Sequence, residues 1–199
     1  MHNSKKEVRF DKRANKYDGG FEGRFLNKFY NTLMDFIQIT PNSKILDVAC
    51  GTGEILKRMD EKFEIDGYGV DIDDKMIHVA NEKCPKMDIR IASCDTLPFE
   101  EQQFDNITVC MAYHHFENKM GFAKEANRVL KQGGSLYLAD LRLPKCLRVA
   151  TNGLMKHLNI VGCFFTPEEI AVEFKKYGFE YSGCIKDGRV QIIRLIKKN

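Results

Sequence analysis

Short, nearly continuous apolar runs alternate with amphipathic stretches along this chain of 199 residues. In residues 20–37, large apolar side chains recur every three or four positions, which predicts a helix with one buried face. Five apolar runs follow and predict strands at about 44–49, 66–70, 87–92, 104–111 and 135–139. Between these runs we expect helices from about Glu54, from Asp73 or Asp74 to Lys83, and over 118–130.

The C-terminal part of the chain predicts a helix and a hairpin. Thr166 can cap a helix that begins at Pro167 and ends at Gly178. Strand-like stretches at about 179–185 and 189–196 surround Lys186-Asp187-Gly188, and Asp-Gly is favoured in hairpin turns. Residues 131–134, with two adjacent glycines, are expected to end the preceding helix in a turn.

Apolar strands that alternate with helices are typical of a parallel sheet covered on both faces. The sequence therefore predicts an α/β fold: a doubly wound, Rossmann-like, seven-stranded and mostly parallel sheet with an antiparallel edge hairpin. A chain of this length is expected to form one domain.

Composition excludes several classes of protein. With 43% hydrophobic and 30% charged residues, the chain is too apolar to be disordered, and no apolar run has the roughly 18 residues of a membrane span. The net charge of +3 is spread without a strongly basic stripe, so no nucleic acid is expected as a partner. Seven cysteines without a Cys-x-x-Cys pair, and an N-terminus without a secretory signal, favour the reducing cytoplasm and no disulfide or metal site.

The most informative segment is 45–54, Ile-Leu-Asp-Val-Ala-Cys-Gly-Thr-Gly-Glu, directly after the first predicted strand. Gly51 and Gly53 let the backbone turn sharply and let a ligand approach it, at the place where doubly wound sheets bind nucleotides. Leu56 occupies the third position of the dinucleotide fingerprint, and Gly-Lys-Ser/Thr of a Walker loop is absent. A ligand with adenosine but without pyrophosphate is therefore favoured.

Two acids and a methionine follow the next strands. Asp71 ends the second strand, where a carboxylate can accept hydrogen bonds from both hydroxyls of a ribose; the alternative is a cap of the next helix. Asp95 ends the third strand and could accept from the exocyclic amine of adenine, or could be an exposed loop acid. Met76 could pack on the adenine face or in the core.

Taken in order, these motifs resemble the class I S-adenosylmethionine-dependent methyltransferases, and most of all the small-molecule group similar to the ubiquinone/menaquinone (type 11) methyltransferases. The resemblance extends from about Phe10 to Ile196. Its motifs are Asp47 with Gly51-x-Gly53, Gly69-Val70-Asp71, Asp95 with Leu97-Pro98-Phe99, Phe104-Asp105-x-Ile107 through His114-His115-Phe116, and Arg128-Val129-Leu130-Lys131-x-Gly133-Gly134. One departure is Ala49, where many relatives have the first glycine of the loop.

The resemblance implies S-adenosyl-L-methionine as cofactor, S-adenosyl-L-homocysteine as product, and a small-molecule acceptor. It implies that the two loop glycines approach the methionine part of the cofactor, that Asp71 holds the ribose, and that Met111 lies beside the sulfonium. The implied cofactor-binding positions are Asp47, Ala49, Gly51, Gly53, Asp71, Ile72, Met76, Asp95, Thr96 and Met111.

Transfer of an activated methyl group requires that the acceptor is aligned with that group and that water is excluded. Some acceptors also need a base that removes a proton. His114 and Tyr17 are the catalytic candidates, with Asp140 as a further possible base. The alternative for His114 and His115 is to orient the loop; as the end of a strand they should face opposite sides and make a poor metal pair. Tyr17, in Lys16-Tyr17-Asp18, resembles the N-terminal tyrosine that folds over the cofactor in this group.

The resemblance implies a single methyltransferase domain over 1–199. Its expected parts are an N-terminal helical cap (1–40), a cofactor-binding core (41–140), a possible acceptor lid (141–165), and a helix with the edge hairpin (166–199). Segment 141–165 could equally be a dimer face or core, and the oligomeric state stays open.

Two other functions remain to be weighed. The chain could be a cofactor-binding regulatory or scaffold protein without turnover, since the motifs support binding rather than transfer. An NAD-dependent oxidoreductase is disfavoured by Leu56. The loop Cys110-Met111-Ala112-Tyr113 lacks the Asn/Asp-Pro-Pro-Tyr/Phe motif of nucleic-acid amino-methylating enzymes, so a small acceptor is expected, with the attacked atom undetermined.

Overall fold

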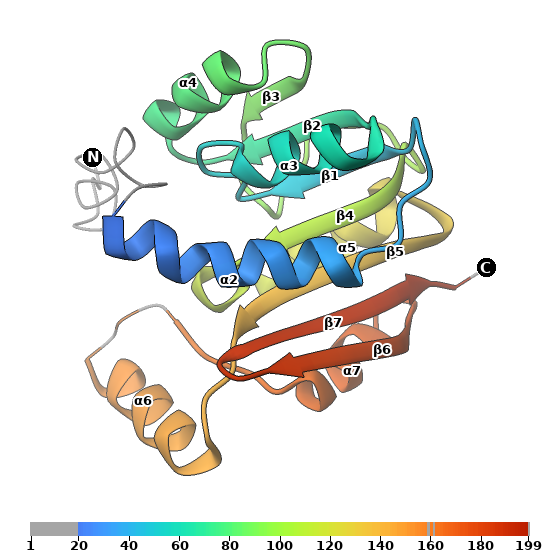
Figure 1. Ribbon diagram of the computed structural model, residues 1–199. Helices are drawn as coiled ribbons and strands as arrows, with labels where there is room; N and C mark the ends of the chain where they lie inside the picture. Colours follow the sequence, from blue (N-terminus) through green and yellow to red (C-terminus); the bar gives the residue numbers. More distant parts are fainter. Residues whose placement is uncertain (1–19, 159, 161, 199) are drawn as a thin grey trace, which may run out of the picture.

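The computed structural model describes residues 20–158, 160 and 162–198, which fold around one seven-stranded sheet in the order β3-β2-β1-β4-β5-β7-β6 (Figure 1). The first five strands pair in parallel, whereas β7 is antiparallel to both β5 and β6. This confirms the predicted sheet and its antiparallel edge. The strands are β1 (Lys44–Val48), β2 (Asp66–Asp71), β3 (Asp88–Ile91), β4 (Phe104–Cys110), β5 (Leu130–Leu141), β6 (Phe179–Asp187) and β7 (Val190–Lys197).

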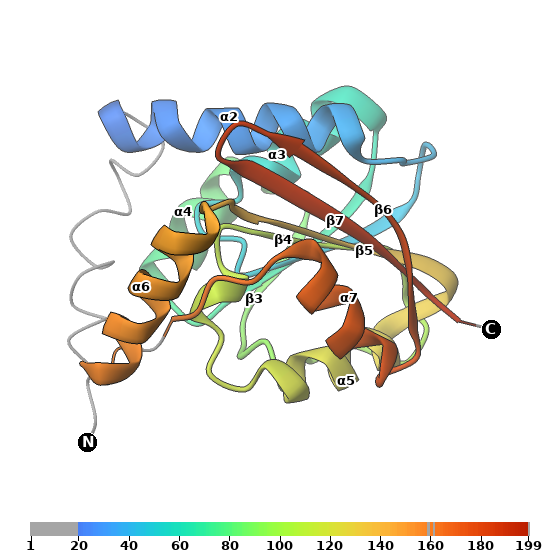
Figure 2. The same cartoon turned by 90° about the horizontal axis from the view of Figure 1, so that it is seen from below.

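Helices cover both faces of the sheet, as expected. The helices α2 (Gly20–Phe36), α3 (Glu54–Phe63) and α4 (Asp74–Lys83) lie on one face, and α5 (Lys119–Val129) and α7 (Pro167–Lys175) lie on the other (Figure 2). A short 3-10 helix, η2 (Tyr113–His115), follows β4. The helix α6 (Lys145–His157) lies beyond the end of β5 rather than on the sheet (Figure 1).

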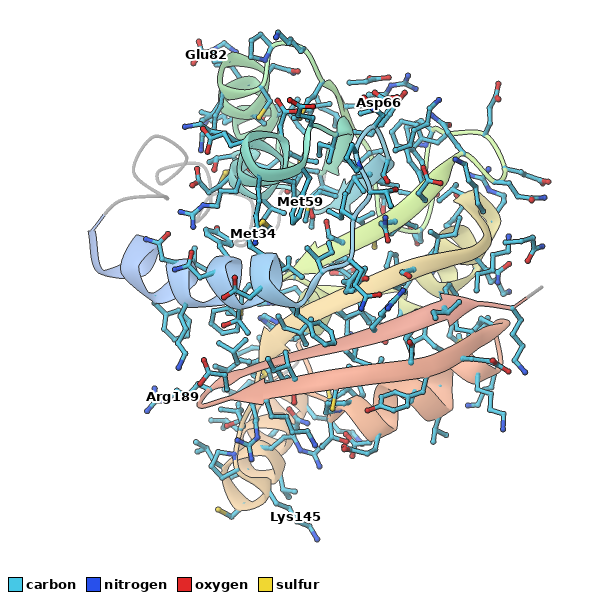
Figure 3. The ribbon with its side chains drawn as sticks, turned by 45° about the vertical axis from the view of Figure 1, so that its right-hand side comes forward. Met34, Met59, Asp66, Glu82, Lys145 and Arg189 are labelled. Atoms are coloured by element: carbon cyan, nitrogen blue, oxygen red, sulfur yellow. The ribbon has the colours of Figure 1, made fainter. Side chains whose placement is uncertain are left out.

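Each face of the sheet has its own apolar layer. On one side, Phe29 and Leu33 of α2 pack with Tyr137 of β5, and all three are almost completely buried. Met34 and Met59 belong to the same layer and come from the neighbouring helices α2 and α3 (Figure 3). On the other side, Phe122 of α5 and Phe174 of α7 pack against the opposite surface of the strands. Burial of such side chains stabilises the fold by about 1.5–3 kcal/mol each.

The order of the strands reverses beside β1, because β2 lies on one side of it and β4 on the other. In open α/β sheets, ligands bind outside the carboxyl ends of the strands at such a reversal. The loops after β1, β2 and β4 meet there, and these loops carry most of the residues selected from the sequence.

One expectation was wrong in detail, and one of the alternatives left open is excluded for α6. Residues 131–134 do not form a separate turn: β5 already begins at Leu130, and the register with β4 shifts between the pairs Phe104–Leu130 and Asn106–Ser135. Gly133 has a φ of 73°, so the extra residues are accommodated as an irregularity within the strand. In addition, no residue of α6 is buried, which excludes core as the role of this helix.

Candidate active site

The loop between β1 and α3 is built on left-handed backbone. Ala49, Gly51 and Gly53 have φ values of 60°, 53° and 74°. At Gly53 a Cβ would lie 3.2 Å from the Cβ of Ala80, so this glycine lets α4 pack close to the loop. At Gly51 a Cβ would meet nothing within 4 Å. Backbone that turns sharply beside open space is what a ligand needs in order to lie against it.

Asp71 ties this loop to the end of β2. Its Oδ2 accepts a hydrogen bond from the Gly51 amide at 2.8 Å, and its Oδ1 accepts one from the Asp73 amide at 3.0 Å. Burial raises the pKa of the Asp71 carboxyl, although these two hydrogen bonds oppose the shift. The cap of α4 is Asp73, whose side chain accepts from the amides of Lys75 and Met76, so Asp71 is not the cap. Each Asp71 oxygen retains a second lone pair for another donor.

Asp47, on β1, is a buried carboxyl with one satisfied oxygen. Its Oδ1 accepts a hydrogen bond from the Thr108 hydroxyl of β4 at 2.7 Å. Its Oδ2 is buried and has no hydrogen-bond partner among the described residues. Burial raises the pKa of Asp47 from 3.8 to about 7, and the Thr108 hydrogen bond opposes this rise. A buried, unsatisfied carboxylate oxygen is costly, and a cationic ligand group is the kind of partner it lacks.

Four further residues that the sequence marked as cofactor-binding follow the ends of β2 and β3. Asp95 accepts hydrogen bonds from the side chains of Ser93 and Asn118, which lower its pKa. Thr96 beside it is exposed. Ile72 is 72% exposed, whereas Met76 is only 3% exposed and lies in the core.

The end of β4 leads into the two histidines. Met111 has a φ of 54°, and its amide donates to the carbonyl of Ala139 at 2.8 Å. His114 and His115 then lie on η2, with ring centroids 3.9 Å apart. The expectation that they face opposite sides was therefore wrong, because a helical turn, unlike a pleated strand, places successive side chains on neighbouring sides. Among the described residues, no group of three or more His, Cys, Asp or Glu could hold a metal.

His114 is buried and held on several sides. Its ring Nδ1 lies 2.7 Å from Oδ1 of Asp140, and its backbone amide donates to Oδ2 of the same residue at 3.1 Å. The ring stacks on Phe164, with centroids 4.7 Å apart and an interplanar angle of 24°. Because a carboxylate only accepts, Nδ1 of the neutral imidazole carries the proton and Nε2 carries the free lone pair.

Segment 141–165 reaches this histidine through Phe164. The side chain of Asn152, on α6, accepts from the Phe164 amide and donates to the Phe164 carbonyl, both at 2.9 Å. The Cys163 amide donates to the His114 carbonyl at 2.9 Å. The helix α6 is therefore linked through these hydrogen bonds to the segment that covers His114.

Comparisons with known proteins identify the activity. Residues 46–138 match the sequence profile of a family described as a methyltransferase domain. The chain is 29% identical to the demethylmenaquinone methyltransferase of Thermotoga maritima, in a match that covers 87% of each protein. The chain is an S-adenosylmethionine-dependent methyltransferase, similar to the quinone methyltransferases.

One further relative agrees with this methyltransferase assignment, and one solved structure shows the same fold. The ubiquinone/menaquinone biosynthesis C-methyltransferase UbiE of Geotalea daltonii is 29% identical, over 75% of this chain and 66% of its own length. A chain from the complex of the Haloferax volcanii Trm112 methyltransferase activator with a methyltransferase has the same fold. Its TM-score is 0.81 at 17% identity, and the match covers 96% of this chain and 98% of that one. No helix in the described part of this methyltransferase is long and apolar enough to cross a membrane.

The residues present fit the cofactor that the family uses. The unsatisfied oxygen of Asp47 suits the amino group of a methionine moiety, the open space at Gly51 suits a ligand against the backbone, and the oxygens of Asp71 suit a ribose. These three residues were predicted from the sequence, whereas Thr108 and Phe164 were not. Thr108 could have been noticed as a hydroxyl within the apolar strand β4, but no sequence pattern marks Phe164. Tyr17 lies outside the described residues.

Proposed function

We propose that this methyltransferase binds S-adenosyl-L-methionine at the carboxyl ends of β1, β2 and β4 and methylates a small aromatic acceptor of the quinol class. The acceptor class rests on the names of the relatives, which act in menaquinone and ubiquinone biosynthesis. The single observation that carries the reaction is the buried pair of His114 and Asp140 beside the loop that follows β4.

The cofactor-binding residues have separate tasks. The Asp47 carboxylate neutralises and orients the amino group of the cofactor through its unsatisfied Oδ2. Asp71 accepts from the ribose hydroxyls, while its hydrogen bond to the Gly51 amide holds the loop in place. Ile72, being exposed beside Asp71, covers the ligand against water. Asp95 and Thr96 face the adenine.

When bound, S-adenosyl-L-methionine supplies a methyl group that is activated by a positively charged sulfur. The protein must align the acceptor with this methyl group and remove a proton from the acceptor. Nε2 of His114 takes the hydroxyl proton of the quinol, which makes a neighbouring ring carbon nucleophilic. Transfer of the methyl group to that carbon would leave S-adenosyl-L-homocysteine. The hydrogen on the ring carbon would then leave as a proton to water, and the His114 imidazolium would return its proton to the acceptor oxygen.

Asp140 positions this base. Its carboxylate fixes the proton on Nδ1 of His114 and stabilises the imidazolium that forms when Nε2 is protonated. Phe164 stacks on the ring and covers it from solvent. Segment 141–165 thus serves as the acceptor lid, and Tyr17 remains a second catalytic candidate. The seven free cysteines support a reducing, cytoplasmic compartment.

The test is transfer of a labelled methyl group to a reduced demethyl-naphthoquinol without a lipid tail, with a phenol and an amine as matched acceptors. We expect carbon methylation of the quinol and a loss of about 10²-fold or more in rate for His114→Asn. Methylation of only the phenol or the amine would overturn the acceptor class. Cofactor binding without transfer to any acceptor would favour the regulatory or scaffold alternative.

A further inference from the structure

Thr108 places a hydroxyl in the buried interior of β4. Its neighbours Ile107 and Val109, like Thr108 itself, are completely buried. Valine has the shape of threonine without the oxygen, so packing alone does not require a hydroxyl at this position. A buried hydroxyl costs free energy unless it is hydrogen-bonded, and this one donates to Oδ1 of Asp47 at 2.7 Å. The carboxyl of Asp47 therefore accounts for the hydroxyl of Thr108.

The register of the sheet explains why Thr108 holds this carboxyl. The strand β1 pairs with β2 on one side and with β4 on the other, and the residues directly opposite Asp47 are Gly69 and Thr108. Gly69 has no side chain, so of these two residues Thr108 alone can bind the carboxyl. The second oxygen of Asp47, Oδ2, is buried and has no hydrogen-bond partner in the part of the chain that the structure describes. One oxygen is thus fixed by the protein and the other is left for a ligand.

The other groups around Asp47 oppose its ionisation. Burial raises the pKa of Asp47, and the nearby Asp71 carboxylate of β2 raises it further, whereas the hydrogen bond from the threonine hydroxyl lowers it. The thiols of Cys50 and Cys110 also lie within reach of this charge, but burial raises their pKa well above the usual range, so they stay neutral. The helices α2 and α3 bring hydrophobic side chains to this layer, together with the phenol of Tyr30.

We propose that Thr108 is a positioning residue for the cofactor: its hydroxyl binds Oδ1 of Asp47 and so holds Oδ2 in one orientation for the amino group of S-adenosyl-L-methionine. Thr108 acts through Asp47. The hydrogen bond favours the ionised carboxylate, which is the form that attracts a positively charged amino group. Cofactor binding therefore releases the proton that Asp47 carries at low pH, and Thr108 sets the pH at which this release occurs. This role rests on the proposed function, because it requires the cofactor to bind at Asp47.

The test is calorimetry of S-adenosyl-L-homocysteine binding between about pH 6 and about pH 8. Pairs of buffers with different ionisation enthalpies count the protons released on binding. For Thr108→Val we expect binding at least about tenfold weaker at pH 7, because a hydrogen bond to a charged group is lost. Its rise in affinity and its proton release should occur at a higher pH than in the parent, since Asp47 then keeps its proton to a higher pH. Thr108→Ser retains the hydroxyl and should show the affinity and the pH dependence of the parent.

The matched control is Thr32→Val in α2. Thr32 is buried and its hydroxyl donates to the carbonyl of Lys28 at 2.7 Å, so this variant loses a similar hydroxyl outside the site. It should bind the ligand like the parent at every pH. In the Asp47→Asn background no carboxyl titrates at this position, so the addition of Thr108→Val should leave the pH dependence unchanged. Parent-like binding by Thr108→Val, or equal weakening in Thr32→Val, would overturn the proposal.

A measurement on the parent without ligand tests the same contact if Thr108→Val does not fold. In an NMR titration, the carboxyl carbon of Asp47 and the hydroxyl proton of Thr108 should shift together, with one midpoint at about pH 7. A Thr108 hydroxyl that exchanges freely with water, or that does not respond to the titration of Asp47, would overturn the proposal.

The role of Thr108 and the proposed function can be told apart. A parent that binds no S-adenosyl-L-homocysteine would overturn the proposed cofactor site, and the role of Thr108 with it. A parent that binds the ligand and transfers the methyl group, while Thr108→Val binds equally well, would overturn only the role of Thr108.

Discussion

The carboxylate of Asp140 accepts two hydrogen bonds from His114, one from the ring Nδ1 at 2.7 Å and one from the backbone amide at 3.1 Å. These residues lie 26 positions apart and come together because β4 and β5 are parallel neighbours. The double contact fixes both the position of the ring and the tautomer in which Nε2 can accept a proton.

The first prediction concerns this positioning. In Asp140→Asn the amide group can donate to Nδ1 of His114 and so move the ring proton to Nε2, where it blocks proton removal. We expect kcat to fall by about 10²-fold, with little change in the affinity for S-adenosyl-L-homocysteine or in KM for the acceptor. A parallel loss of cofactor affinity and thermal stability would instead give Asp140 a purely structural role.

The second prediction concerns Asp71. In Asp71→Asn one of its two amide donors loses an acceptor and the ribose loses a charged partner, and each such bond contributes about 1.5–3 kcal/mol. We expect S-adenosyl-L-homocysteine to bind at least about tenfold more weakly in calorimetry. The control is Asp73→Ala, which removes the cap of α4 and should lower stability by about 1 kcal/mol while leaving affinity close to that of the parent. Unchanged affinity in Asp71→Asn would refute the ribose role.

The third prediction compares three glycines with left-handed backbone. Gly51→Ala and Gly133→Ala should each destabilise the fold by about 1 kcal/mol through backbone strain, since neither Cβ would meet an atom within 4 Å. Only Gly51→Ala should also weaken cofactor binding, because its Cβ would occupy space that the ligand uses. Gly53→Ala should destabilise more than either, because its Cβ would press on Ala80. Equal affinities for the Gly51 and Gly133 variants would mean that the ligand does not lie against Gly51.

The fourth prediction follows from the raised pKa of Asp47, about 7 against an ordinary 3.8. The Asp47 carboxyl therefore stays protonated to a higher pH in the folded state than in the unfolded state. This difference contributes about 4 kcal/mol to the free energy of unfolding. The contribution is complete below about pH 4 and is lost as the pH rises through about 7. In urea unfolding, Asp47→Asn should show a weaker decline over this range than the parent and should be the more stable of the two at pH 8.

Cofactor binding should depend on pH in the opposite direction. The ionised Asp47 attracts the amino group of the ligand, so the affinity of the parent for S-adenosyl-L-homocysteine should increase between pH 6 and pH 8. The Asp47→Asn variant should bind more weakly and without this increase. A parent whose affinity is flat over this range would contradict the assigned role of Asp47.

Local patterns predicted the elements, because the apolar period and the caps are properties of neighbouring residues. Thr166 caps α7 in a capping box with Glu169, and the Asp-Gly pair lies at the tip of the edge hairpin, as expected. The glycine loop and Asp71 could be found because their chemistry depends on their place after a strand. The bulge at the start of β5 could not, since it depends on the register between two strands.

The features of the site that the sequence did not predict depend on contacts between residues far apart in the chain. Asp47 and Thr108 are 61 positions apart, and the proton preference of Asp47 depends on the depth at which β1 and β4 bury it. The stacking of Phe164 on His114 depends on how the chain returns from α6, for which the sequence offers no periodic signal. The arrangement of the two histidines was missed because a single helical turn replaces the end of β4.

The central claim is that the edge formed by Asp47, Gly51 and Asp71 is an S-adenosyl-L-methionine site. The most direct measurement is a thermal-shift series with S-adenosyl-L-methionine, S-adenosyl-L-homocysteine and NAD in parallel. At a hundred times its dissociation constant a ligand adds about 2.7 kcal/mol, which for this chain length raises the unfolding midpoint by about 5–10 °C. We expect this rise with both adenosyl ligands and none with NAD. A rise with NAD alone, or with none of the three ligands, would contradict an S-adenosyl-L-methionine site at this edge.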